Sequence, residues 1–333
     1  VVMRKDLLKN ILYVNLNDNS FEIRKRPELF QEYIGGTGVA IQVLNEETNS
    51  DTAPLGEDNV IVLATGPLVG AFPMASKAVA MFKSPLTGNL GESHAGGRAS
   101  TSIRSAGLGA IVIKGKATIP SYLVVDGHHV YFRDARTFWK MKDSREPRYA
   151  IAKREKRSGF RTILVTGPAA DNKVAFADVV SESYRHFGRM GLGAVFGSKS
   201  LKAIQIGGKY AIPVKDRKGY RKIHTHIMDR CTEPKFVAKY RELGTAENVM
   251  PLNDVGGLPT RNLQQTTFEH AENISGEHLQ KNFLARRIAC SNCPVACIHL
   301  AALREAFQPE SYFYKTTLVS YDYELIYALG SML

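Results

Sequence analysis

The sequence predicts an α+β protein with a β-rich first domain, residues 1–210, and a mainly α-helical second domain, residues 211–333. Short β-type runs separated by glycines fill the first range, whereas helical periodicity replaces strand alternation after Ile212 and Pro213. Several segments of the first domain also occur twice, which predicts an internal duplication. A chain of 333 residues is long enough for about two domains.

The first domain opens with a predicted β-hairpin, NILYVNLNDNSFEIRK at 10–25, whose Asn-Asp-Asn segment favours a turn. The next segment, PELFQEYIGGTGVAIQVLNEE at 27–47, has helical spacing of its apolar residues on both sides of its glycines. Further strands are predicted in VIVLATGP (60–67), AVAMFKS (78–84), GAIVIKGKA (109–117), SYLVVDGHHVYFRD (121–134), RTILVTGP (161–168) and KAIQIGGK (202–209).

The predicted duplication depends on three pairs of similar segments. VIVLATGP at 60–67 resembles TILVTGP at 162–168. AGLGAIVIKGKA at 106–117 is echoed by MGLGAV and LKAIQIGGK within 190–209, and the strand–turn–strand pattern of 11–24 resembles 121–133. Two similar β-rich halves would explain all three pairs.

The second domain shows long helical periodicity over residues 214–250, without strand alternation. GEHLQKNFLARR at 276–287 predicts another helix, directly before a cluster of cysteines. The predicted boundary near residue 210 therefore separates a β-rich part from a helical part.

Composition and charge exclude some classes of protein. The chain is 44% hydrophobic and 23% charged, and it has no apolar run near the ~20 residues of a membrane span. Its opening, VVMRKDLLKN, lacks the apolar region of a secretory signal, so we expect a cytoplasmic protein that does not enter a membrane.

The net charge of +12 is densest at 132–161, where eleven Lys and Arg residues face four Asp and Glu residues. No aromatic stacking platform accompanies this charge, which favours a solvated helix face over nucleic-acid binding. Attraction of an anionic cofactor or of an acidic electron-carrier protein is a third use of such charge.

Two glycine-rich segments resemble nucleotide-binding motifs without completing them. IGGTGVAIQVL has Ile41 in place of the third glycine of a dinucleotide fingerprint and follows a helix-like segment, which argues against a Rossmann fold. GRMGLGAVFGSKS at 188–200 contains no P-loop pattern. Its glycines still allow backbone N–H groups to approach an anion beside Arg185, Arg189 and Lys199; tight turns with a solvated basic rim are the alternative.

KSPLTGNLGESHAGGRAS at 83–100 has a similar character. His94 precedes the pair Gly96 and Gly97, and the following residues could begin a helix. A lone histidine is more often structural than functional, but a diglycine permits close approach of the backbone to a ligand.

Three cysteines stand at C-x2-C-x3-C spacing in CSNCPVACIH, namely Cys290, Cys293 and Cys297. Thiolates at such spacings hold iron–sulfur clusters. A zinc site with His299 as fourth ligand is the main alternative, and three structural thiols are a second one. A radical-SAM site usually has the reverse order of spacings, so we set it aside. The other cysteine, Cys231, lies 59 residues before Cys290 in a helical stretch.

Together these motifs resemble the tungsten-containing aldehyde ferredoxin oxidoreductase family. The resemblance covers most of residues 4–333. It is carried by ILYVNL, GGTGVAIQVL, ATGPLVG, KSPLTG with SHAGG, AGLGAIVIKGKA, GPAADN, RHFGRMGLGAVFGSKSLKAI, LGTAENV, GLPTRNLQ and CSNCPVACIH. It implies oxidation of aldehydes to carboxylates at a tungsten, or molybdenum, centre held by two pyranopterins, with electrons passed through a [4Fe-4S] cluster to ferredoxin.

The resemblance also implies the site residues. The β-rich domain would form a base under one pterin, and the backbone carbonyls of His94 and His186 would hold a Mg²⁺ ion that bridges the pterin phosphates. Cys290, Cys293 and Cys297 would bind the cluster. Pterin and phosphate contacts would fall on Lys77, His94, Ala95, Gly96, Gly97, Arg185, His186, Gly188 and Arg189.

Two positions depart from the family's better-known members, which have arginine in place of Lys77 and asparagine in place of His94. Lysine keeps the positive charge but loses the bidentate fork of arginine. A backbone contact at His94 would survive the change, whereas a side-chain contact would not.

In the family, the fourth cluster cysteine, the second pterin's main contacts and the acid/base residues lie further downstream, in chains about twice as long. YDYELIYALGSML at 321–333 matches a point inside the family's second domain, so the helical domain is expected to be incomplete and no catalytic residue is assigned. We therefore expect a homo-oligomer or a partner chain that completes the site. One alternative is a truncated or split subunit for pterin binding or electron transfer, without catalysis of its own. Another is a relative within the family that reduces aromatic-ring thioesters.

Overall fold

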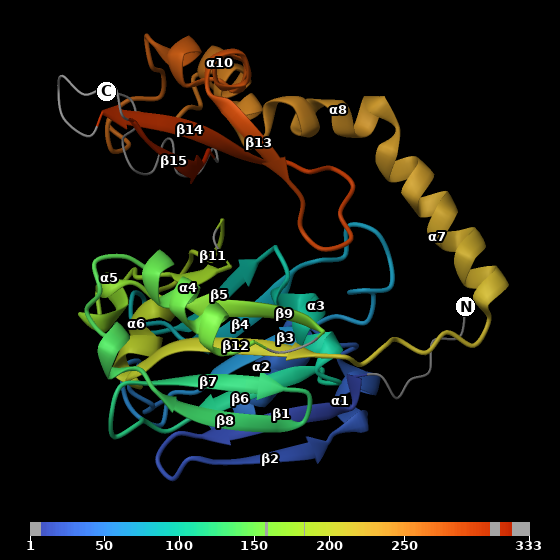
Figure 1. Cartoon of the computed structure of the whole chain (residues 1–333), viewed down its shortest axis with the longest axis vertical. Coiled ribbons are helices and arrows are strands. Elements are labelled where there is room, and N and C mark those ends of the chain that lie inside the picture. The colour runs from blue at the N-terminus through green and yellow to red at the C-terminus, as the bar shows by residue number, and fades with distance from the viewer. Residues whose placement is uncertain (1–7, 157–158, 183, 307–313, 322–333) are drawn as a thin grey trace. The chain divides into compact units, whose positions relative to one another are not determined.

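The computed structural model describes residues 8–156, 159–182, 184–306 and 314–321 (Figure 1). The chain divides into two compact units, 1–223 and 224–333, and the division falls inside helix α7 (Arg217–Thr232). The boundary predicted at 210 lies just after the last strand of the first unit, β12 (Leu201–Gly208). The matched segment at 322–333 lies outside the described residues.

The first unit contains two six-stranded sheets with the same strand order. The first is β2-β1-β6-β3-β4-β5, and the second, read in the same direction, is β8-β7-β12-β9-β10-β11. In each sheet one pair is parallel, β1 with β6 and β7 with β12, and the other pairs are antiparallel. The strands of the first sheet are β1 (Asn10–Asn15), β2 (Ser20–Lys25), β3 (Ile61–Thr65), β4 (Ala78–Lys83), β5 (Leu90–Ala95) and β6 (Ala110–Lys114); the remaining strands of the second are β7 (Ser121–Asp126), β8 (His129–Asp134), β9 (Phe160–Val165), β10 (Val179–Ser181) and β11 (Arg185–Phe187).

The predicted first elements are confirmed. β1 and β2 form the hairpin, in which Asn19 takes the left-handed φ of 55° that a tight turn requires. Helices α1 (Pro27–Glu32) and α2 (Thr37–Glu47) flank Gly35 and Gly36. In the first unit, strands β5, β10 and β11 were not predicted.

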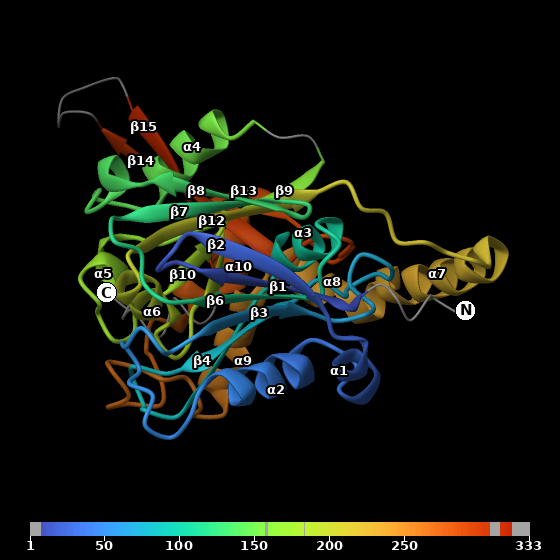
Figure 2. The same ribbon diagram turned by 90° about the horizontal axis from the view of Figure 1, so that it is seen from below.

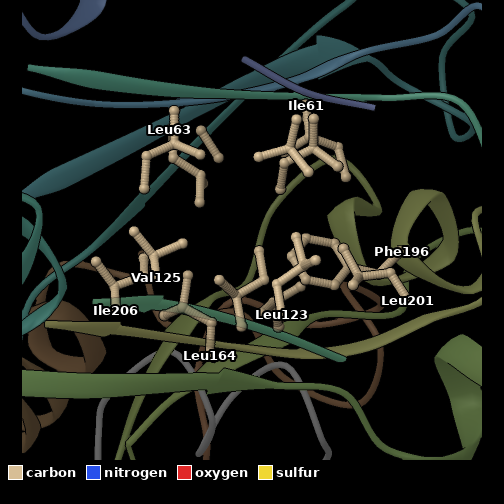
Figure 3. Packing of buried hydrophobic residues seen from close by; sticks show 14 of the residues in the cluster. Ile61, Leu63, Leu123, Val125, Leu164, Phe196, Leu201 and Ile206 are labelled. Atoms are coloured by element: carbon tan, nitrogen blue, oxygen red, sulfur yellow. The ribbon is translucent and has the colours of Figure 1, made fainter. Parts of the chain in front are cut away.

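The main hydrophobic core lies between the two sheets (Figure 3). Ile61 and Leu63 of β3 point toward Leu123 and Val125 of β7, and all four side chains are buried. Phe196, from helix α6 (Leu192–Ser198), fills the same layer. Alternate residues of each strand thus supply this core, and burial of a large apolar side chain stabilises the fold by about 1.5–3 kcal/mol.

Helices cover the outer faces of both sheets (Figure 2). α2 packs Val39 and Val43 against the first sheet, where they meet Met81 of β4. The 3₁₀ turn η2 (Arg136–Phe138) and helix α4 (Arg145–Arg154) cover the second sheet, through Phe138 and Ile151. Shorter helices α3 (Ala99–Ser105) and α5 (Pro168–Asp171) complete the unit.

Over the residues that the structure describes, the second unit is helical in its first part and forms a sheet after it. It continues from α7 through α8 (Pro234–Leu243), η3 (Thr245–Asn248), α9 (Val249–Asp254), η4 (Ala271–Ile274) and α10 (Gly276–Asn282). A three-stranded antiparallel sheet follows: β13 (Leu284–Ile288), β14 (Ile298–Ala306) and β15 (Tyr314–Ser320). The helix predicted over 276–287 therefore ends at Asn282, because pairing with β14 draws the residues after Phe283 into a strand.

None of the helices in the described ranges combines the length and the apolar character that crossing a membrane requires.

Candidate functional site

The edge strands of the two sheets, β5 and β11, lie next to each other. This contact brings together two segments that are about ninety residues apart in the sequence, His94–Gly97 and Arg185–Arg189. Edge strands carry main-chain groups that their own sheet does not use, so this junction offers carbonyl and N–H groups to a ligand. Most of the residues assigned to the cofactor by resemblance are therefore neighbours in space.

Lys77 lies at the same end of the first sheet. It directly precedes Ala78, which pairs with Ala95 across β4 and β5, so Lys77 stands beside the turn formed by Gly96 and Gly97. Its side chain is exposed. The structure thus places a cation next to the diglycine turn.

A carboxylate from the second sheet holds the diglycine turn. Glu182, which follows β10, accepts a hydrogen bond from the Arg98 N–H group at 2.8 Å and another from the Thr162 hydroxyl at 2.9 Å. Gly97 has a φ of 83°, a conformation that favours glycine, and a Cβ atom there would lie 3.4 Å from a carboxylate oxygen of Glu182. α3 begins two residues later, as the sequence suggested.

The imidazole rings of His94 and His186 are both held by carboxylates. Nε2 of His94 lies 2.6 Å from Oε1 of Glu92, and Nδ1 of His186 lies 2.7 Å from Oδ2 of Asp178. The Thr37 hydroxyl at the start of α2 also contacts Glu92, at 3.4 Å. One ring nitrogen of each histidine is therefore engaged by a carboxylate of the protein.

Two buried serines of the first sheet fix the chain after β11. The Ser93 hydroxyl accepts a hydrogen bond from the Arg189 N–H group at 3.1 Å, and the Ser84 hydroxyl donates to the Met190 carbonyl at 2.8 Å. Gly188, between β11 and these contacts, is exposed. The basic loop at 188–190 is therefore anchored on the first sheet.

The exposed charged side chains of the junction are basic, whereas its carboxylates, Glu92, Asp178 and Glu182, are half-buried. Lys77, Arg98 and Arg189 are exposed and Arg185 is half-buried. Burial raises the pKa of the Glu182 carboxyl above its ordinary range, against the opposite effect of the Thr162 hydrogen bond and the Arg98 charge. Ala95, Gly96 and Gly97 themselves are buried, whereas the basic side chains around this turn reach the surface. Such basic side chains beside a glycine turn suit phosphate oxygens, so the residues present fit a phosphate-bearing cofactor.

Lys199 does not belong to this site. Its side chain is fully buried, and its ammonium group donates to the carbonyls of Glu57 at 3.1 Å and Gly115 at 2.9 Å. The expectation that Lys199 stands with Arg185 and Arg189 beside an anion, or on a solvated rim, was wrong, because the lysine instead ties α6 to two loops of the first sheet.

The three clustered cysteines occupy the loop between β13 and β14. They are half-buried thiols, and the Cys293 N–H group donates to the Cys290 carbonyl at 3.1 Å. Within the residues that the structure describes, no three His, Cys, Asp or Glu side chains are gathered closely enough to hold a metal ion. The donor set suits an iron–sulfur cluster by its chemistry, whereas this conformation of the loop does not bring the thiols together.

His299, the alternative fourth ligand for zinc, is fully buried on β14. Its Nε2 atom lies 3.0 Å from the carbonyl oxygen of Arg241, and its Nδ1 faces Gly244, where a Cβ atom would lie 3.1 Å away. The ring thus packs on the end of α8. Cys231 lies in α7, as the helical periodicity predicted.

The sequence motifs do not identify the residues that hold the predicted site residues in place. They are acidic or hydroxyl-bearing and come from short polar strands and turns: Ser84, Glu92, Ser93, Asp178 and Glu182. The one available signal was proximity in sequence, since a carboxylate stands two residues before His94 and another three residues before Arg185.

The chain is similar in sequence to one enzyme family over nearly its whole length. The pattern of the aldehyde ferredoxin oxidoreductase N-terminal domain matches residues 11–208, and the pattern of domains 2 and 3 of the same family matches residues 222–333. Tungsten-containing aldehyde ferredoxin oxidoreductase of Thermococcus kodakarensis is 33% identical over 97% of this chain and 52% of its own length. The enzyme of the same name from Pyrococcus furiosus is 31% identical over 96% of this chain and 52% of its own length.

Two further relatives carry other names. The WOR-like subunit of an aliphatic sulfonate oxidoreductase from Pyrococcus furiosus is 28% identical over 85% of this chain and 47% of its own length. Among solved structures, the active-site complex BamBC of benzoyl-coenzyme A reductase with 1,5-dienoyl-CoA superposes with a TM-score of 0.75, at 24% identity, over 97% of this chain and 50% of that chain. At this identity the superposition supports a likeness of fold.

This chain thus spans about half the length of the curated relatives that it matches. Within that span the match is continuous across both units. The chain belongs to the aldehyde ferredoxin oxidoreductase family.

Proposed function

We propose that this chain supplies the pterin-binding base, and three of the four cluster ligands, of an oxidoreductase of the aldehyde ferredoxin oxidoreductase type. The observation that carries the proposal is the junction of β5 and β11, where residues 94–97 and 185–189 meet beside Lys77. A surface of this kind, with basic side chains around a glycine turn, matches the phosphates of a pyranopterin.

The residues would act by binding and orientation. Lys77, Arg185 and Arg189 neutralise phosphate charge, and the turn at Gly96 and Gly97 lets N–H groups approach the ligand without a side chain in the way. The backbone carbonyls of His94 and His186 would hold the Mg²⁺ ion, since oxygen ligands are what this cation prefers. When bound, the tungsten or molybdenum bis-pyranopterin supplies the redox chemistry that converts an aldehyde to a carboxylate.

Cys290, Cys293 and Cys297 would provide thiolates to a [4Fe-4S] cluster once the β13–β14 loop closes around it. The fourth ligand would come from a further part of the enzyme, either in the same polypeptide or in a partner chain. Ferredoxin, or another iron–sulfur carrier, would accept the electrons.

We further propose that the enzyme is cytoplasmic. Its first domain would have arisen by internal duplication, and its complete second domain would be mainly helical. The equal strand order of the two sheets supports the duplication. We also propose that a homo-oligomer or a partner subunit completes the cofactor-binding site and is needed for activity.

A second candidate function is that of a subunit in a larger complex. Such a subunit would either have no catalysis of its own or take part in the reduction of aromatic-ring thioesters in place of aldehyde oxidation. The names of two relatives favour it, because one is a subunit of a sulfonate oxidoreductase and the other is part of a benzoyl-coenzyme A reductase complex. The resemblance to the family implies a substrate pocket built mainly from downstream residues, so the junction would serve either chemistry equally.

Metal analysis of protein purified without oxygen from its native locus tests the proposal, with the mass of every co-purifying polypeptide recorded. Tungsten or molybdenum together with about four irons per assembly is the expected result. Absence of both metals and of iron would refute it. Assay of the same material with an aldehyde and with an aromatic thioester then separates the two candidates.

A further inference from the structure

We infer that Glu182 is the positioning residue of the candidate site: it locks the Gly96–Gly97 turn to the segment that carries Arg185 and Arg189. The inference rests on the proposed function, which assigns both segments to a phosphate-bearing ligand. Glu182 itself is not a contact residue in this scheme, because its carboxylate is used by the protein.

The contacts of Glu182 cross from one sheet to the other. Its Oε1 atom accepts from the Arg98 N–H group at 2.8 Å, and its Oε2 atom is 4.0 Å from Nε of Arg98. The Thr162 hydroxyl, on β9, donates to the same Oε1 at 2.9 Å and fixes the carboxylate from its own sheet. Glu182 stands just before β11, and Arg98 directly follows Gly97. The side chain of Glu182 therefore joins two segments that are 84 positions apart in the sequence.

The backbone at Glu182 indicates that its side chain is required there. Its φ is 66°, in the left-handed region where glycine is favoured and where other residues cost of order 1 kcal/mol. Its N–H group donates to the Ile163 carbonyl at 2.9 Å, which fixes this conformation. In this conformation the carboxylate lies close to Gly97, 3.4 Å from the position of a Cβ atom there.

Because the Glu182 carboxylate is negatively charged, its positioning role and its electrostatic effect on anion binding have opposite signs and can be told apart. A carboxylate beside Lys77, Arg98 and Arg189 opposes anion binding by Coulomb's law, so removing its charge alone should strengthen binding. Removing its hydrogen bonds should weaken binding, because the turn then loses its anchor. Glu182→Gln removes only the charge, whereas Glu182→Ala removes both.

The test titrates the full chain with inorganic pyrophosphate and Mg²⁺ in a calorimeter. We expect Glu182→Gln to bind as tightly as the unmodified protein or more tightly, and Glu182→Ala to bind about fivefold more weakly, as loss of one hydrogen bond implies. Asp143→Ala is the matched control, since Asp143 accepts from the Arg145 and Glu146 N–H groups, at the start of α4. Thr162→Val, which keeps the shape of the side chain, should weaken binding in the same direction as Glu182→Ala.

Hydrogen exchange provides a readout that needs no ligand. Amides of the peptide covering 95–99 should exchange faster in Glu182→Ala and in Thr162→Val, and at the original rate in Glu182→Gln and Asp143→Ala. Either of two results would overturn the inference. One is unchanged exchange in both Glu182→Ala and Thr162→Val; the other is pyrophosphate binding by Glu182→Ala that equals or exceeds that of the unmodified protein. Failure of the unmodified protein to bind pyrophosphate would count against the proposed function, and the exchange result would still decide the role of Glu182.

Discussion

The ammonium nitrogen of Lys202 lies 2.7 Å from a carboxylate oxygen of Asp171, and neither side chain has any exposed surface. Asp171 also accepts the Lys140 N–H group at 2.8 Å, so the pair ties β12, α5 and the turn after η2 together. Burial lowers the pKa of Lys202, while the bond to Asp171 opposes that shift. Each charge thus depends on the other.

Replacing Lys202 with Met should destabilise the first unit by about 3–5 kcal/mol, because it leaves a buried carboxylate without its cation. Urea denaturation followed by circular dichroism measures the change. Lys153→Met, on the exposed face of α4, is the control and should change stability by less than about 0.5 kcal/mol. Equal effects of the two substitutions would show that the pair is not held as described.

Lys199 should make stability depend on pH in the alkaline range. Burial lowers its pKa from the ordinary 10.5 to about 8, while the charges of Glu57 and Asp58 oppose the shift. Between these values the unfolded chain binds the proton and the folded protein does not, so stability rises with pH through this window and the gain is lost as pH falls through 8. The neutral amine can still donate to both of its carbonyl partners.

The measurement is the free energy of unfolding at pH 8 and at pH 9.5. Both pH values lie below the ordinary pKa of tyrosine. The contribution of one proton is at most about 1.4 kcal/mol per pH unit. Lys199→Met should flatten the dependence. A slope that is the same in both proteins would contradict the assignment to Lys199.

Gly197 allows α6 to pack against α5. A Cβ atom on Gly197 would lie 1.8 Å from the Ala170 carbonyl oxygen, so Gly197→Ala should cost about 1–3 kcal/mol through overpacking. Gly167→Ala is the matched control in the same region, since Gly167 has a φ of −96° and no atom within 4 Å of its Cβ position. Urea midpoints compare the two, and a tolerated Gly197→Ala would mean that α5 can move away from α6.

The cluster assignment predicts a spectroscopic difference between cysteines. In anaerobically purified assembly, Cys293→Ser should remove the visible absorbance of the iron–sulfur cluster and reduce the iron content, because a thiolate ligand is lost. Cys231→Ser, in α7, should leave both unchanged. Tightly bound zinc without a visible band in the unmodified protein would instead support the zinc alternative.

Hydrophobic patterning predicted most strands of the first unit, including the edge strands β2 and β8, and missed β5, β10 and β11. β3, β6 and β12 are apolar runs bounded by glycines, and the structure confirms them. β5 reads Leu-Gly-Glu-Ser-His-Ala and β11 reads Arg-His-Phe; their polar side chains face a site in place of a core, so alternation and propensity carry no signal there. The strands that build the site were therefore the ones that periodicity could not find.

The same limit applies within the site. The motifs placed the glycines and the basic residues, because these have recognisable spacings around KSPLTG and RHFGRMG. Glu182 and Ser93 act through contacts 84 and 96 residues away, and long-range pairing of this kind leaves no local pattern. The sheet formed by β13, β14 and β15 was missed for a similar reason, since its pairing outweighed the helical periodicity of residues 283–287.

The contact of β5 with β11 also bears on how the protein avoids self-association. An exposed sheet edge readily recruits strands from other molecules, and this unit would present two such edges side by side. Because β5 and β11 lie against each other, and Glu182, Ser84 and Ser93 hold the surrounding turns, each edge shields the other. Substitutions that loosen this junction would therefore promote aggregation as well as weaken the proposed ligand binding, because both properties depend on the same few hydrogen bonds.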